Sequence, residues 1–153
     1  MPRPAPAALL LALALPLAGC ATGSHSLLAT PSPQTPPPAT MVHLADVRTG
    51  MCLDADRLPG TGRVAYLEVL GCAVDHTAEV VAVLDGNDPA ARGDAPCSDA
   101  FQAYVGSVPD HSDTAVRVLT ASADAWDRSG PAPTVCLAVS PTPVTGSVRG
   151  TGR

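Results

Sequence analysis

This sequence of 153 residues contains no lysine and very few aromatic residues. Its nine basic residues are all arginine, and its aromatic side chains are one Phe, two Tyr and one Trp. Together with abundant Ala, Gly, Pro and Asp, the missing lysine indicates the codon usage of a GC-rich genome and says nothing about function. The scarcity of aromatic residues excludes a core built on large aromatic side chains, so a folded domain needs another source of stability.

Motifs that carry enzyme chemistry are missing as well. The sequence contains no G-x-S-x-G, which excludes the nucleophile elbow of serine hydrolases. The Gly-rich segment 146–152 opens no predicted helix and is therefore not a phosphate-binding loop. No two cysteines are spaced C-x-x-C, so the cysteines lack the local geometry typical of a structural zinc site.

The long apolar stretch near the N-terminus, residues 9–20 (LLLALALPLAGC), has the pattern of a secretory signal. Arg3 precedes it, and small residues stand just before Cys20. Segment 5–19 contains two prolines and is shorter than the roughly 20 residues that cross a bilayer, which disfavours an uncleaved membrane helix.

The end of this stretch, Leu17-Ala18-Gly19-Cys20, resembles the lipobox of bacterial lipoproteins. The resemblance implies transfer of a diacylglyceryl group to the Cys20 thiol, cleavage after Gly19, and removal of residues 1–19. Insertion of an acyl chain into the bilayer stabilises membrane binding by about 0.8 kcal/mol per buried CH₂. The acyl chains would therefore hold the protein on the extracytoplasmic face of the cell membrane. Ordinary secretion, with Cys20 incidental, is the alternative.

The mature chain is long enough for one domain. Without Arg3 it carries eight arginines against fourteen acidic residues, a formal charge of −6, which excludes nucleic acid as an expected partner. Residues 20–41 are rich in Pro, Ser and Thr and predict a disordered tether. Residues 42–153 are expected to form the globular domain.

Four cysteines remain besides Cys20, namely Cys52, Cys72, Cys97 and Cys136. Outside the cytoplasm an even number of cysteines in a small domain predicts two disulfides, and four cysteines allow three connectivities. A zinc site is the alternative that their spacing disfavours.

The periodicity predicts an α+β fold, with a small antiparallel or mixed sheet packed by one main helix. Strands are expected within 50–53, 64–70, 79–84, 115–120 and 134–139, with 79–84 central. A helix with Asp94 as N-cap carries an apolar stripe that includes Cys97, whose sulfur should face the core, and Gly106 ends it. A single helical turn is expected after Ser122, and the tail 145–153 is expected to be loose or a short edge.

From Gly50 onward the sequence resembles the actinobacterial septum-formation family of extracytoplasmic domains. The matching features, in chain order, are Gly50 and Cys52, then Cys72, then His76 with Glu79 and Val80, a helix with Cys97, Phe101 and Tyr104, Trp126, the run Val135-Cys136-Leu137, and Thr-Gly-Ser-Val at 145–148. The resemblance implies a disulfide-stapled α+β domain of the cell envelope, linked to division or wall growth, without an established reaction. It also implies the pairs Cys52–Cys72 and Cys97–Cys136, worth about 3 and about 4 kcal/mol by loop entropy.

His76 and Glu79 are the candidate site residues. Residues three apart in a strand point to opposite sides, so joint action requires a turn at this point. His76 would then serve as a base oriented by Asp75, or bind a metal with Glu79 and His111. The structural alternative, which we favour, is that His76 hydrogen-bonds backbone and has no chemical role.

Trp126 has two interpretations as well, a partner anchor or a plug of the small core, of which the plug is favoured.

The leading functional hypothesis is a non-enzymatic, lipid-anchored domain that binds or scaffolds an envelope or division protein, and no cofactor is expected. A small hydrolase or metal-dependent enzyme using His76 and Glu79 is the first alternative. A ligand-capture lipoprotein is the second.

Overall fold

The computed structural model describes residues 38–153 except 89, 91–92, 123–125 and 127–129. The expected signal segment 1–19, Cys20 and most of the expected tether therefore lie outside the described residues. The elements, in chain order, are β1 (Thr40–His43), the 3₁₀ turn η1 (Leu44–Asp46), β2 (Cys52–Leu53), η2 (Ala55–Arg57), β3 (Arg63–Val64), β4 (Tyr66–Leu70), β5 (His76–Leu84), α1 (Asp94–Val105), η4 (Pro109–His111), β6 (Ala115–Ala121) and β7 (Thr134–Val144). In this part of the chain, no helix has the length and apolar character needed to span a membrane.

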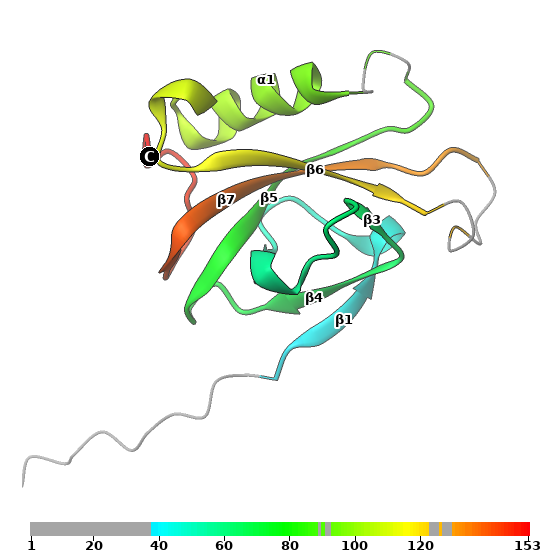
Figure 1. Cartoon of the computed structure of the whole chain (residues 1–153), viewed down its shortest axis with the longest axis horizontal. Coiled ribbons are helices and arrows are strands. Elements are labelled where there is room, and N and C mark those ends of the chain that lie inside the picture. The colour runs from blue at the N-terminus through cyan, green and yellow to red at the C-terminus, as the bar shows by residue number, and fades with distance from the viewer. Residues whose placement is uncertain (1–37, 89, 91–92, 123–125, 127–129) are drawn as a thin grey trace, which may run out of the picture. The chain divides into compact units, whose positions relative to one another are not determined.

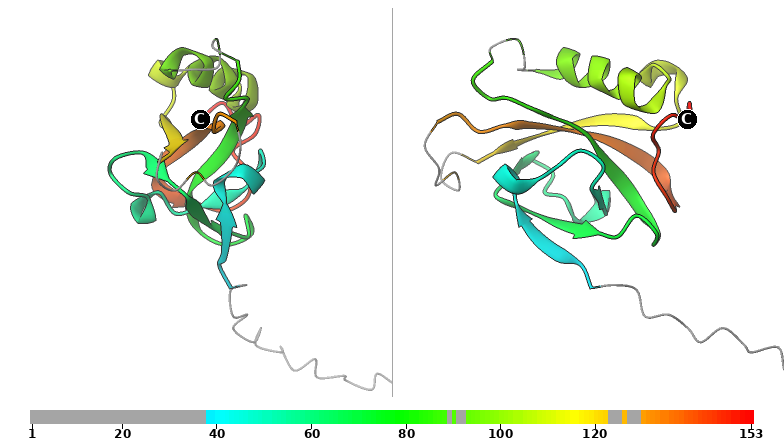
Figure 2. Two further views of the ribbon diagram at one scale, coloured as in Figure 1. Left: turned by 90° about the vertical axis from the view of Figure 1, so that its right-hand side faces the viewer. Right: turned by 180° about the vertical axis from the view of Figure 1, so that it is seen from behind.

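The strands form one seven-stranded mixed sheet in the order β1-β4-β2-β5-β7-β6-β3. All neighbours pair antiparallel except β3 and β6, which are parallel. The expected α+β class is confirmed, and β5 is central as predicted. Only Ala65 separates β3 from β4, although these strands lie near opposite ends of the sheet order, so the sheet has to curl (Figures 1 and 2).

Two apolar clusters fill the two sides of the sheet. The first lies within the curl, and its buried members are Leu44, Val47, Leu53, Val64, Leu67, Ala78, Val80, Leu119, Val135 and Leu137. The second lies between the sheet and α1, which covers β5, β6 and β7 in Figure 1, and consists of Val81, Cys97, Phe101, Val105, Cys136, Ala138 and Val148. Strand β7 contributes alternate residues to the two clusters, as the period of two in a strand requires.

Both expected disulfides are present, Cys52–Cys72 and Cys97–Cys136. The first links β2 to the turn after β4. The second fastens α1 to β7 through two fully buried residues, so the prediction that Cys97 faces the core is confirmed.

The N-terminal strands differ in detail from the prediction. The first strand, β1, begins at Thr40, inside the expected tether, and the expected strand at 50–53 is reduced to β2 because η1 and a turn separate it from β1. The expected strand at 64–70 is broken at Ala65 into β3 and β4, and the Ala65 carbonyl accepts a hydrogen bond from the Leu44 amide at 2.9 Å, which continues the register of β1 and β4 by one residue. That break is where the chain leaves β3 and enters β4.

The two longest strands extend beyond their predicted ends. β5 begins at His76, and β7 runs through Pro141 and Pro143 to Val144. His76 of β5 pairs with Val144 of β7, and Ala78 pairs with Val139. A move of two residues along β5 thus corresponds to five residues along β7, so β7 bulges where its prolines lie. Proline lacks the N–H that a ladder needs, which is why the regular pairing stops there.

The helix and its ends follow the prediction with one shift. Gly93 occupies the N-cap position and Asp94 is the first helical residue, so the expected Asp94 cap is wrong by one position. Gly106 ends the helix in the left-handed conformation with φ of 88°, as predicted, and its N–H donates to the Gln102 carbonyl at 3.0 Å.

The C-terminal tail is held by one buried side chain and by backbone hydrogen bonds, which corrects the expectation that it is loose or a short edge. Val148 is buried in the cluster beneath α1. The amides of Gly150 and Gly152 donate to the carbonyls of Tyr104 and Val105, each at 2.9 Å, which satisfies acceptors at the end of α1. The tail therefore closes the C-terminal end of the helix.

Candidate functional site

The site is centred on Glu79, a carboxylate on β5 that is only 1% exposed. Three donors satisfy it. The Tyr104 hydroxyl donates to Oε1 at 2.5 Å, the Ser147 hydroxyl donates to the same oxygen at 2.7 Å, and the Val148 amide donates to Oε2 at 2.6 Å. Since a buried charge is tolerated only when it is well hydrogen-bonded, Glu79 ties the central strand to α1 and to the C-terminal tail.

His76 lies beside this carboxylate and is 2% exposed. Its Nδ1 lies 2.8 Å from the Val74 carbonyl oxygen, so Nδ1 carries the proton and Nε2 presents a lone pair. Nε2 is buried and has no hydrogen-bond partner among the described residues. The expected backbone hydrogen bond of His76 is thus present, and the other ring nitrogen is left with unused bonding capacity.

Cys52 completes the cluster from the neighbouring strand. It pairs directly with Glu79 in the register of β2 and β5, so the two side chains share one face. One ligand atom each from Cys52, His76 and Glu79 lies within 4.8 Å of the other two. His76 and Glu79 come together although both lie on the strand β5, so no helical turn is needed. His111, the expected third metal ligand, is exposed at the end of η4 and does not belong to this group.

Gly50 lies beside this cluster in the left-handed conformation that favours glycine. Its φ is +88°, whereas a Cβ at this position would make only an ordinary contact of 3.6 Å with the Tyr104 hydroxyl. Its amide donates to the Val80 carbonyl at 2.8 Å, which fixes the segment before Cys52 against β5. The Gly-x-Cys pattern thus positions the first cysteine next to Glu79.

The burial of His76 and Glu79 limits what they can do. Neither side chain reaches solvent, so neither touches a substrate in this conformation. The arrangement suits a structural carboxylate or a small ion.

A shallow pocket of about 400 Å³ lies over Tyr104. Val81, Ala100, Ala103 and Arg149 complete its lining, and the Arg149 guanidinium carbon stands 4.6 Å from the centre of the Tyr104 ring. This cation–π contact covers the residue that holds Glu79 and helps to fix the tail on the helix.

An aromatic group lies on another part of the surface, where β1 and β4 pair. The His43 ring meets Tyr66 edge-on at 5.1 Å and lies 5.8 Å from the Trp126 ring. Tyr66 is 54% exposed, and Met41, also on β1, is 63% exposed. Trp126 is half-buried against His43 and contributes to neither buried cluster, so its placement differs from that of a core plug. We call His43, Tyr66 and Trp126 with Met41 the aromatic patch.

The local structure around Trp126 is described only in part. Of the expected helical turn, residues 123–125 lie outside the described residues, while the Trp126 amide donates to the Ser122 carbonyl at 3.0 Å. The indole N–H donates to the Gly130 carbonyl at 2.8 Å, which fixes the ring in the patch.

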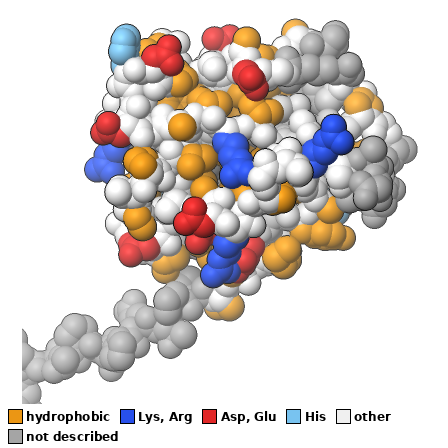
Figure 3. All heavy atoms as spheres, in the orientation of Figure 1, with side chains coloured by type: hydrophobic (Ala, Val, Ile, Leu, Met, Phe, Trp, Pro, Cys, Tyr) orange, Lys and Arg blue, Asp and Glu red, His pale blue; other side chains and the backbone are white. Residues whose placement is uncertain are grey.

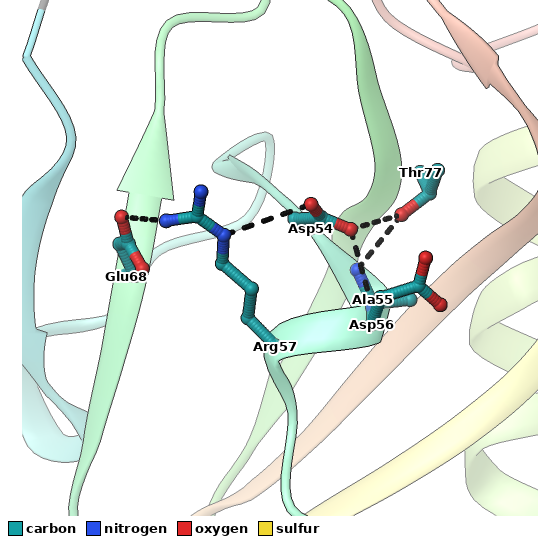
Figure 4. A network of polar contacts seen from close by, with 6 residues as sticks. All are labelled: Asp54, Ala55, Asp56, Arg57, Glu68 and Thr77. Atoms are coloured by element: carbon teal, nitrogen blue, oxygen red, sulfur yellow. Dashed lines mark hydrogen bonds and ion pairs between the residues drawn. The ribbon is translucent and has the colours of Figure 1, made fainter.

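A separate polar network joins β5 to the loop after β2 (Figure 4). The Thr77 hydroxyl donates to Asp54 at 2.9 Å and accepts from the Ala55 amide at 2.8 Å. Arg57 pairs with Glu68 on β4, and this hydrogen bond raises the pKa of the guanidinium above its ordinary value. The network orders the loop above the first apolar cluster, and its charged groups face solvent. Its role is therefore to stabilise the loop after β2 against β4 and β5.

Charges are mixed on the face seen in Figure 3, where acidic and basic side chains stand among apolar atoms. Such a mixture does not favour a polyanionic partner on this face.

Comparisons of the chain with protein-family models, with curated proteins and with solved structures give no match.

Sequence reasoning identified His76, Glu79 and the four disulfide cysteines but not the partners of Glu79. The sequence places Tyr104 on the predicted helix, and it places Ser147 and Val148 in a tail that is expected to be loose or a short edge. The available signal is Val148, an apolar residue that directly follows the small polar pair Gly146-Ser147. Its side chain packs into the second apolar cluster and so brings Ser147 close to Glu79.

Proposed function

We propose that this protein is a lipid-anchored extracytoplasmic domain that binds another protein of the cell envelope and does not catalyse a reaction. The partner that we propose is a component of septum formation or cell-wall growth, as the resemblance of its motifs implies. The aromatic patch is the single observation that carries the binding role. It combines an exposed Tyr, a half-buried Trp and an exposed Met on one part of the surface.

Aromatic side chains and Met are enriched at protein–protein interfaces because they bury a large area at low entropic cost. Tyr66 and His43 are held on paired positions of β4 and β1, so the patch is preorganised by the sheet. The burial of His76 and Glu79 supports the non-enzymatic part of the proposal, since the most plausible reactive pair is enclosed.

The lipid anchor rests on the lipobox-like Leu17-Ala18-Gly19-Cys20. Two disulfides support an extracytoplasmic location, because disulfides form and persist in oxidising compartments. Growth with labelled palmitate should label the native chain and not a Cys20→Ala variant, and the intact mass should show cleavage before Cys20. A Thr22→Ala control should be labelled like the native chain.

The binding role is tested by photocrosslinking in intact cells. A photoreactive phenylalanine analogue replaces Tyr66 in the patch, and a matched variant carries it at Asp99, an exposed position on α1. A discrete adduct formed from position 66 and not from position 99, and identified by mass spectrometry as an envelope or division protein, is the expected result. Equal adducts from both positions, or none from position 66, would argue against the patch as the binding surface.

A further inference from the structure

We propose that reduction of the Cys52–Cys72 disulfide turns the buried cluster into a site for one zinc ion. The ligands would be the thiolates of Cys52 and Cys72, the imidazole of His76 and the carboxylate of Glu79. This site goes beyond the binding function proposed above and does not depend on the lipid anchor.

The first observation is the distance between the donor atoms. Atoms of Cys52, His76 and Glu79 already lie within 4.8 Å of one another. Tetrahedral zinc with bonds of about 2.0–2.3 Å places its ligand atoms roughly 3.3–3.8 Å apart, so modest side-chain rotation closes the set. The fourth donor, Cys72, is bonded to Cys52 and therefore lies at the same place.

The second observation is the state of His76. Its Nδ1 donates to the Val74 carbonyl at 2.8 Å, while Nε2 is buried and finds no partner in the part of the chain that the structure describes. Metal-binding histidines show this arrangement, in which one ring nitrogen donates to a carbonyl and the other offers its lone pair to the metal. A buried acceptor without a donor is otherwise costly, so its presence beside a carboxylate points to a cation.

The third observation is the support of Glu79. Its three donors come from α1 and the tail, and they orient the carboxylate without occupying all of its lone pairs. Two thiolates and one carboxylate would exceed the charge of Zn²⁺ by one unit, and the Tyr104 and Ser147 hydroxyls are placed to offset that excess.

The redox step controls whether the site exists, because a sulfur in a disulfide is not a thiolate ligand. A dithiol reductant supplies two electrons and two protons. The S–S bond of Cys52–Cys72 breaks, two S–H bonds form, and the reductant closes its own disulfide. Zinc then displaces both thiol protons to solvent.

The two disulfides differ in access, which makes the step selective. Cys72 is half-buried in the turn after β4, whereas Cys97 and Cys136 are both fully buried beneath α1. A thiolate must reach a sulfur to attack it, so Cys52–Cys72 is expected to open first. The helix would remain fastened to β7 while the zinc site forms.

The test uses the purified full chain and zinc alone. A dithiol is added until mass spectrometry after alkylation shows that Cys52 and Cys72 are free, and zinc is titrated by calorimetry in two buffers to count protons. We expect one ion per chain, release of about two protons, and affinity at least 100-fold higher than that of the oxidised chain. Cobalt substitution should give a thiolate charge-transfer band.

The second disulfide supplies a matched control. A Cys97→Ala, Cys136→Ala chain should bind zinc after reduction like the native chain, whereas Cys52→Ala, Cys72→Ala should abolish binding. His76→Gln should weaken binding at least tenfold. Zinc added before reduction should preserve the cooperative unfolding transition of the native chain.

Four outcomes would overturn the proposal: equal zinc affinity of oxidised and reduced chains, binding that survives loss of Cys52 and Cys72, a folded reduced chain that binds no zinc, or unfolding on selective reduction whether or not zinc is present.

Discussion

The phenolic hydroxyl of Tyr104 donates a hydrogen bond to the buried carboxylate of Glu79 across the interface of α1 and the sheet, with 2.5 Å between the oxygens. The same carboxylate receives the hydroxyl of Ser147 and the amide of Val148. Three segments distant in sequence thus meet at one charge. Because a buried carboxylate becomes destabilising when its donors are removed, the helix, the central strand and the tail depend on each other.

Replacing Tyr104 by Phe removes one donor and keeps the ring. Hydrogen bonds to charged groups contribute about 1.5–3 kcal/mol, so the free energy of unfolding should fall by that amount. Urea denaturation followed by far-UV circular dichroism measures it. Gln102→Ala, at an exposed position of the same helix, is the control and should change stability by less than about 0.5 kcal/mol. Equal stability of both variants would show that Tyr104 does not support Glu79.

The elements set by local pattern were predictable from the sequence. The stripe that includes Cys97, Phe101 and Val105 gives the helix because these positions recur with a helical period, and all three are buried. Val135 and Leu137 alternate with Cys136, which gives a strand buried on both faces. The cysteine pairs followed the resemblance of the motifs, and the structure confirms them.

What could not be predicted depends on contacts between distant residues. Ser147 lies 68 positions from Glu79, and no local periodicity connects them. Pro141 and Pro143 lie beyond the predicted strand 134–139, yet β7 continues through them by bulging against β5. The irregular pairing at His76 accompanies that bulge and leaves no mark in the hydrophobic pattern.

The two disulfides should carry much of the stability of this domain. Loop entropy gives about 3 kcal/mol for Cys52–Cys72 and about 4 kcal/mol for Cys97–Cys136, against a net stability of about 5–15 kcal/mol for typical domains. Each cysteine pair is replaced by alanine in turn, and thermal unfolding is followed by calorimetry. Each double variant should melt lower, and the fully reduced chain should lose its cooperative transition in the absence of zinc. Retention of that transition at a similar temperature would contradict this account.

The turn after β5 packs tightly against the segment that leads into β7. In that turn, the backbone amide and then the side chain of Asn87 donate to Asp85, which holds the pKa of Asp85 below its ordinary value. A Cβ on Gly86 would lie 2.0 Å from the Ala132 carbonyl oxygen. Gly86→Ala must therefore displace backbone and should cost about 2 kcal/mol or more in urea denaturation.

Gly60 provides the control for that variant. A Cβ there meets nothing within 4 Å, so Gly60→Ala should leave stability nearly unchanged or raise it slightly. Similar losses for the two variants would mean that the contact of Gly86 with Ala132 does not constrain the turn.

The C-terminal tail should contribute to stability through Ser147 and Val148, and two truncations separate this effect from that of the last residues. Deleting residues 149–153 removes the Arg149 contact with Tyr104 and the last backbone hydrogen bonds but keeps both donors that the tail supplies to Glu79. Deleting 147–153 removes those donors and the buried Val148 side chain as well.

The longer deletion should lower the free energy of unfolding by at least about 3 kcal/mol more than the shorter one, because it leaves a buried carboxylate with one donor. Urea denaturation of the two truncated chains measures the difference, and Ser147→Ala in the full chain, with an expected loss of about 1.5–3 kcal/mol, checks that the carboxylate is responsible. Equal stabilities of the two truncated chains would show that the tail does not stabilise the buried carboxylate of Glu79.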